Sequence, residues 1–143
     1  MSHLGKAVVK MGLLSLFSIM PLAAQITDGL RFTAPFSFYV GKTKMPPGSY
    51  TLSQPAALNL TMLLVRGIDG ADSAAIGITP TWSVQSPRQS KVIFEKYGDD
   101  LYLNRVLLEG NSDGVKVLPT KTEIKAEENA RVVEERSIAA SGQ

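Results

Sequence analysis

Four residues in the stretch KYGDDLYLN, Tyr97-Gly98-Asp99-Asp100, match the metal-binding hairpin of RNA-dependent polymerases. Two-metal phosphoryl transfer needs carboxylates from at least two segments, because the two ions lie about 3.5 to 4 Å apart. A chain of 143 residues is too short for a polymerase palm with a basic template channel. The motif is therefore interpreted as a turn in which Gly98 and the aspartates supply the turn conformations.

The remaining carboxylates do not show the spacing of a known catalytic or metal site. Adjacent aspartates at 99 and 100, and the pair Asp69 and Asp72 around a glycine, lack the repeated spacing that converges six to eight oxygens on calcium. A glycosidase needs two acids facing each other across a cleft. The candidates by acidity alone, all interpreted as solvated charges, are Asp69, Asp72, Glu95, Asp99, Asp100 and Glu109.

Histidine and cysteine are nearly absent. The single histidine is His3, and there is no cysteine. Without them the rest of the chain cannot form a Ser-His or Cys-His nucleophile, a zinc site of the usual ligands or a histidine general base. We therefore predict a protein that is not an enzyme, with no catalytic residues, no metal and no cofactor.

Aromatic side chains are the other candidate for a binding surface. Trp82, Tyr39, Tyr97 and Tyr102 could form a stacking platform for a sugar or a peptide. The alternative is that these rings pack in the core and across strands, as aromatic residues of β proteins do. These four residues are therefore the candidates for ligand or partner contact.

The first 24 residues have the pattern of a secretory signal peptide. Lys6 and Lys10 lie in a polar start, residues 11–20 are apolar, and PLAAQ predicts cleavage after Ala24. The apolar run is shorter than the about 20 residues that span a bilayer, although a retained N-terminal anchor is the alternative. We expect a secreted or periplasmic protein without a membrane anchor after cleavage.

The mature chain is expected to be electrically neutral. Of the 15 basic residues, removal of Lys6 and Lys10 leaves 13, against 13 acidic residues. A neutral chain lacks the basic surface that binds nucleic acid or anionic membranes. We therefore expect no nucleic-acid partner.

The elements that would position these residues are predicted strands. Residues 30–40 alternate between apolar and polar side chains, which indicates a strand with one buried face, at an edge or with a bulge because of Pro35. Pro47-Gly48 fits a type II turn and Asp69-Gly70 a hairpin. Further strands are predicted at 49–53, 58–67, 73–84, with an interruption at Pro80, 91–97, 101–110 and 114–119. The spacing predicts an all-β domain over residues 25–119, a single antiparallel β-sandwich or small barrel of about seven strands.

Residues 120–143 have a different composition. Thr120 and Glu123 form a Thr-x-x-Glu capping box, which predicts a short helix over the charged residues that follow. Its apolar residues form only a broken stripe, so we expect a helix that docks weakly. The last residues, SIAASGQ, are predicted to be a disordered end.

Three stretches together resemble a family of small secreted bacterial β-rich proteins of unknown function. They are TAPFSFYVGKTKMPPGSYTL, LLVRGIDGADSAAIGITPT and KVIFEKYGDDLYLNRVLLEG, followed by VLPTKTEIKAE. The family pattern has a Pro-Phe-x-Phe strand, a Pro-x-Gly-x-Tyr turn, a Leu-Leu-x-Arg strand and a Phe-x-Lys-Tyr-Gly-Asp hairpin. The likeness covers about residues 33–127 and implies an exported all-β domain without an assigned activity. The matching hairpin residues, as structural features, are Phe94, Lys96, Tyr97, Gly98 and Asp99.

The sequence thus favours a non-catalytic envelope or extracellular module that acts by binding or self-assembly. The aromatic strand at 30–40 could complete the sheet of a second copy, and an envelope protein or a glycan is the other expected partner. A small-ligand or glycan-binding β-domain is the first alternative. A carboxylate-dependent hydrolase is the second.

Overall fold

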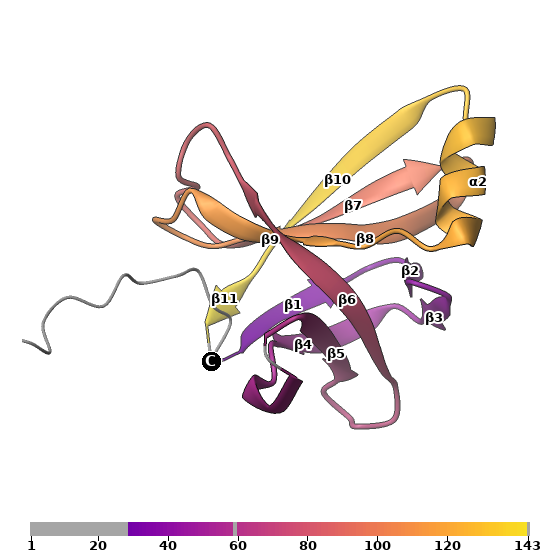
Figure 1. Cartoon of the computed structure of the whole chain (residues 1–143). Helices are drawn as coiled ribbons and strands as arrows, with labels where there is room; N and C mark the ends of the chain where they lie inside the picture. Colours follow the sequence, from indigo (N-terminus) through magenta and orange to yellow (C-terminus); the bar gives the residue numbers. More distant parts are fainter. Residues whose placement is uncertain (1–28, 59, 143) are drawn as a thin grey trace, which may run out of the picture.

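The structure is a computed structural model that describes residues 29–58 and 60–142. It consists mainly of strands, with the helix α2 (Lys121–Asn129) and the 3-10 turn η2 (Ala56–Leu58) (Figure 1). The strands are β1 (Leu30–Ala34), β2 (Phe38–Val40), β3 (Thr43–Met45), β4 (Gly48–Ser53), β5 (Met62–Gly67), β6 (Ser73–Trp82), β7 (Lys91–Tyr97), β8 (Asp100–Leu107), β9 (Asp113–Val117), β10 (Val133–Ala139) and β11 (Ser141–Gly142). The predicted signal peptide, with His3, lies outside the described residues.

The strands form one continuous mixed sheet in the order β10-β7-β8-β9-β6-β5-β4-β1-β11. The long strand β6 connects its two halves, because residues 73–77 pair with β5 and residues 78–82 pair with β9. Figure 1 shows β6 crossing between β7 to β10 on one side and β1, β4 and β5 on the other. The all-β prediction is confirmed, and the described chain has eleven strands where about seven were expected, because several are only two or three residues long.

The core lies where the inward faces of both halves meet. Phe32, Phe38 and Phe94 have ring centroids 5.2 to 6.1 Å apart, and Tyr50 stacks on Phe32 at 5.7 Å. The predicted alternation along residues 30–40 is confirmed at four positions whose side chains are buried in the core: Phe32, Ala34, Phe38 and Val40. Tilted and edge-on ring pairs of this kind add stabilisation beyond their buried area.

Proline 35 divides the strand that was predicted as one unit. Pro35 has no N–H for a ladder, and residues 35–37 separate β1 from β2. β1 pairs with β4, whereas β2 pairs with β3 and, in parallel at Tyr39, with β8. The break therefore sends one sequence segment to two different places in the sheet.

The predicted turns are partly confirmed. Gly98 has a φ of 66° between the paired residues Tyr97 and Asp100, as a two-residue hairpin with glycine first requires. Gly70 has a φ of 78°, and the Asp69 Oδ1 accepts a hydrogen bond from the Ala71 N–H at 3.1 Å. Both segments are therefore turns.

Two other expectations about proline were wrong. Gly48 does not have the positive φ of a type II turn, because it already belongs to β4 and pairs with Ala34. The turn lies instead at Gly41, with a φ of 60°, between β2 and β3. Pro80 does not interrupt β6, where it pairs with Val115 of β9.

The expectation for the C-terminus was wrong in its second half. The N-cap is as predicted, because the Thr120 Oγ1 accepts a hydrogen bond from the Glu123 N–H at 3.3 Å. The helix ends at Asn129, however; β10 takes the last residues expected in the helix and the first of the expected disordered end, and β11 takes two more residues of that end. β10 pairs with β7 along its full length, and β11 pairs with β1. The backbone of β7 supplies a ladder that the local sequence does not reveal.

Candidate functional site

Three of the four aromatic candidates lie together. Tyr39 and Tyr102 are stacked with ring centroids 5.1 Å apart, and Tyr97 lies 5.6 Å from Tyr102. Trp82 is elsewhere, at the end of β6 opposite Asp113, with 77% of its surface exposed. The structure thus separates the tryptophan from a tyrosine cluster formed by Tyr39, Tyr97 and Tyr102.

Strand pairing explains the tyrosine cluster. Tyr102 of β8 is paired with Tyr39 of β2 on one side and with Glu95 of β7 on the other. Directly paired residues project from the same face of a sheet, and so do residues two apart on one strand. Tyr97 therefore joins the same face, and its hydroxyl donates a hydrogen bond to the Glu95 carboxylate.

Helix α2 brings Glu123 to this cluster. Glu123 has only 4% of its surface exposed. Burial, followed by the charges of Glu95 and Glu127, raises the pKa of Glu123 to about 7, although a hydrogen bond from the Thr120 backbone and the charge of Lys116 act in the opposite direction. The helix therefore docks through a carboxyl group that favours its protonated form.

The hydroxyls of Tyr97 and Tyr102 are also held in their neutral form. Burial raises the pKa of Tyr97, followed by its hydrogen bond to Glu95. Burial raises the pKa of Tyr102 as well, followed by the charge of Asp100. These rings are buried, so they pack the helix against the sheet and present little surface to a ligand.

The aspartates of the polymerase-like motif lie on the surface. Asp99 and Asp100 are exposed at the β7–β8 hairpin. Asp69 and Asp72 line a separate cavity of about 280 Å³ beside Tyr50. Within residues 29–58 and 60–142, no three Asp, Glu, His or Cys side chains are grouped closely enough to hold a metal ion.

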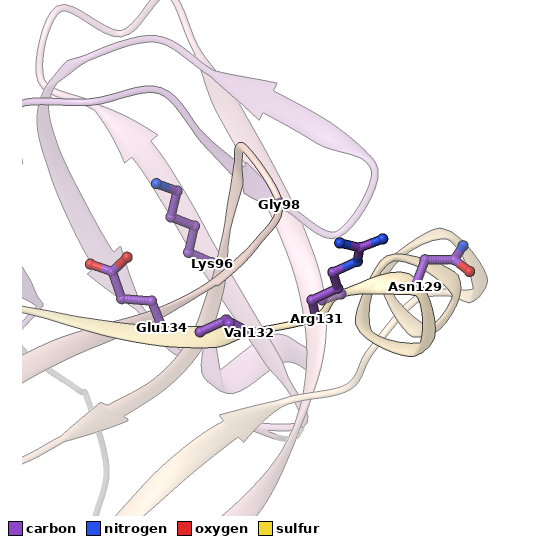
Figure 2. Close-up of a pocket in the computed structure, with 7 residues that line it drawn as sticks. Lys96, Gly98, Asn129, Arg131, Val132 and Glu134 are labelled. Atoms are coloured by element: carbon purple, nitrogen blue, oxygen red, sulfur yellow. The ribbon is translucent and has the colours of Figure 1, made fainter.

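A larger cavity lies where α2 turns into β10 (Figure 2). Its volume is about 440 Å³, and the lining residues are Lys96, Gly98, Asn129, Ala130, Arg131, Val132 and Glu134. Lys96 of β7 and Glu134 of β10 are directly paired, and Figure 2 shows their side chains on the same side of the two strands. We name this cavity the α2–β10 cleft.

The edge of the sheet borders the α2–β10 cleft. β10 occupies one end of the strand order, and within the described part of the chain it pairs only with β7. Next to this edge, Val132 and Val133 are 76% and 48% exposed. An edge strand with unpaired N–H and C=O groups is a template for another strand.

Sequence reasoning missed this site because it placed residues 133–142 in a helix end and a tail. A signal was present in the adjacent Val132 and Val133, since β-branched residues favour strands. A second signal was the alternation of Arg136, Ile138 and Ala140, which are the less exposed residues at this end. The dense charges between them concealed both patterns.

No family model matches the chain, and no curated protein or solved structure matches it at a significant level. The resemblance to a family of small secreted proteins therefore stays a prediction. None of the helices in the described part of the chain has the length and apolar character needed to cross a bilayer.

Proposed function

We propose that this protein is an exported, non-catalytic binding module that takes an extended polypeptide segment as an additional strand on β10. The observation that carries this proposal is the position of β10, which is paired on one side only and lies next to the α2–β10 cleft. Main-chain hydrogen bonds to such an edge supply affinity, and a neighbouring pocket supplies specificity.

β10 is a better pairing edge than the N-terminal strand. β1 is already paired with β4 and, at its first two residues, with β11. Phe32 and Ala34 of β1 are buried in the core, so β1 could enter a second copy's sheet only if those contacts were lost. β10 can accept a strand without such a loss.

The proposal includes a closure of the sheet, by which we mean that its first and last strands meet at one point. β10 and β11, at opposite ends of the strand order, are separated in the chain only by Ala140. Ala140 is buried, and its N–H donates a hydrogen bond to the Ser90 carbonyl at 2.8 Å. This closure ties down the C-terminal end of β10 and leaves its other end, near α2, accessible.

The length of β10 suits strand addition. β10 has seven residues and is therefore longer than a typical strand of about five to six residues. In an antiparallel ladder, the N–H and C=O of one residue point to one neighbour and those of the next residue to the other. About half of the backbone groups of β10 therefore face away from β7 and can bind a partner.

The test uses a probe peptide and a pair of proline variants. The probe is an acetylated and amidated nonapeptide of sequence STVTQTVTS. Glu135→Pro and Arg136→Pro remove adjacent N–H groups, so one removes an outward donor and the other a donor to β7. We expect the peptide to slow amide exchange in residues 133–139 of the unaltered protein. The proline variant that loses only the outward donor keeps its bonds to β7 and should be the better-folded one of the two. In this better-folded variant the peptide should no longer slow exchange. Equal protection in that variant, or no protection at millimolar peptide, would refute strand addition.

Glycan binding is a second candidate because Trp82 is 77% exposed. An indole ring that stands free at the surface can stack on a sugar face. Titration with a panel of oligosaccharides would quench or shift the fluorescence of Trp82, the only tryptophan in the chain. An unchanged spectrum across the panel would remove this candidate.

A further inference from the structure

The α2–β10 cleft carries cations that have no charged partner in the described part of the chain. Its charged lining residues are Lys96, Arg131 and Glu134. Glu134 is paired with the Arg136 guanidinium at 3.3 Å. Lys96 and Arg131 make no ion pair with any residue that the structure describes. The cleft therefore presents positive charge to an incoming segment.

Both cations are within reach of a strand added to β10. Such a strand would lie about 4.8 Å from β10 and about 10 Å from β7. Lys96 is paired with Glu134 and shares its face, and a lysine side chain has four methylenes with which to cross most of that distance. Arg131 directly precedes Val132 and β10, at the end that the closure at Ala140 leaves accessible. A side chain of the added strand on this face that stands opposite Val132, and not opposite the Glu134 carboxylate, would lie between the two cations.

A second copy of β10 is a poor occupant of the same edge. Two copies related by a two-fold axis would pair antiparallel, with one residue opposite itself. Registers centred on Glu134, Glu135 or Arg136 place like charges directly opposite each other, which is destabilising. These charges at the middle of β10 discourage self-pairing, as charged residues on edge strands commonly do.

We infer that the occupant of β10 is an extended segment of a different protein that places an acidic side chain between Lys96 and Arg131. This inference rests on the proposed strand addition and names the chemistry of the partner. An ion pair at the rim of a binding site affects selectivity and association rate more than total affinity. The acidic residue would therefore select among extended segments that the backbone of β10 could bind equally well.

The experiment compares two peptides that differ by one charge. The first is the neutral nonapeptide STVTQTVTS, and the second is STVTETVTS, in which glutamate replaces the central glutamine. We expect the acidic peptide to bind about tenfold more tightly at low salt, which corresponds to about 1.4 kcal/mol. The preference should decrease as salt is raised, because exposed charges are screened.

Matched variants identify the charges responsible. In the double variant Lys96→Gln and Arg131→Gln the two peptides should bind equally. The control is Arg66→Gln with Arg88→Gln, which removes two exposed cations, one from β5 and one from the β6–β7 connection. This control should keep the preference, because its net charge changes by the same amount at positions that do not pair with β10.

The outcomes separate the two proposals. Equal binding of both peptides to the unaltered protein, with loss in the better-folded proline variant, would overturn the acidic preference and leave strand addition supported. Loss of the preference in the control variant as well would overturn the assignment to Lys96 and Arg131. Binding of neither peptide would refute both proposals. Dimers in sedimentation experiments that a β10 proline variant abolishes would show a second copy as the occupant and overturn the inference.

Discussion

Protonation of Glu123 should control how firmly α2 is docked. The pKa of this carboxyl rises from 4.5 in the unfolded chain to about 7 in the folded protein, chiefly because it is buried. The folded state therefore holds the proton more tightly than the unfolded state. The protonated Glu123 carboxyl therefore stabilises the folded state. This stabilisation is fully present below pH 4.5 and is lost as the pH rises through about 7.

The magnitude follows from the size of that rise. One pKa unit is worth about 1.4 kcal/mol, so the full displacement sets an upper limit of about 3 kcal/mol. A shift of the short helix α2 that admits water to the ionised carboxylate would relieve part of this penalty, and we expect about 1 to 2 kcal/mol. A loss of this size would lower the melting temperature by several degrees in a domain of this length.

The test is the variant Glu123→Gln, which keeps the shape of the side chain and removes its titration. Urea unfolding followed by far-ultraviolet circular dichroism would be measured at pH 5 and at pH 8. We expect the variant to be more stable than the unaltered protein by about 1 to 2 kcal/mol at pH 8 and by about half as much or less at pH 5, where the unfolded chain has begun to lose its proton and the folded protein has not. The control Glu128→Gln changes an exposed glutamate of the same helix and should not show this pH dependence.

Two results would refute the reasoning. If Glu123→Gln and the unaltered protein have the same difference in stability between pH 5 and pH 8, Glu123 does not titrate in this range. If Glu128→Gln reproduces the effect, the cause is the net charge of the helix and not the burial of one carboxyl group.

Three further substitutions test the fold around the site. Phe94→Ala removes a fully buried ring that contacts three other phenylalanines, and urea unfolding should show a loss of about 3 to 5 kcal/mol. Gly98→Ala has space for its methyl group but requires a φ of 66°, and the same assay should show a loss of about 1 kcal/mol; a neutral result would contradict the turn assignment. Thr120→Ala removes the N-cap of α2 and should cost about 1 kcal/mol, with amide exchange faster at Glu123 than in the unaltered protein. Unchanged exchange at Glu123 would show that the cap contributes nothing to docking.

The sequence by itself determined those structural features that are specified by residues close to them in the chain. The alternation along residues 30–40 selected the buried face of β1 and β2, because side chains alternate along any strand. The glycine at 98 determined the β7–β8 hairpin, since few other residues adopt a positive φ at low cost. The Thr120 capping box determined where α2 begins. Each of these signals lies within a few residues of the feature that it specifies.

Only the tertiary structure decided the features that join distant segments. β10 lies 36 to 48 residues from its partners in β7, and its charged sequence alone favours a helix or a tail. The tyrosine cluster depends on the register that places Tyr39 opposite Tyr102. The α2–β10 cleft exists because the helix ends at Asn129 and the chain returns to the edge of β7. The physical reason is that the backbone of β7 offers the same hydrogen bonds to any strand, so the partner is chosen by the packing of the whole sheet and not by local sequence.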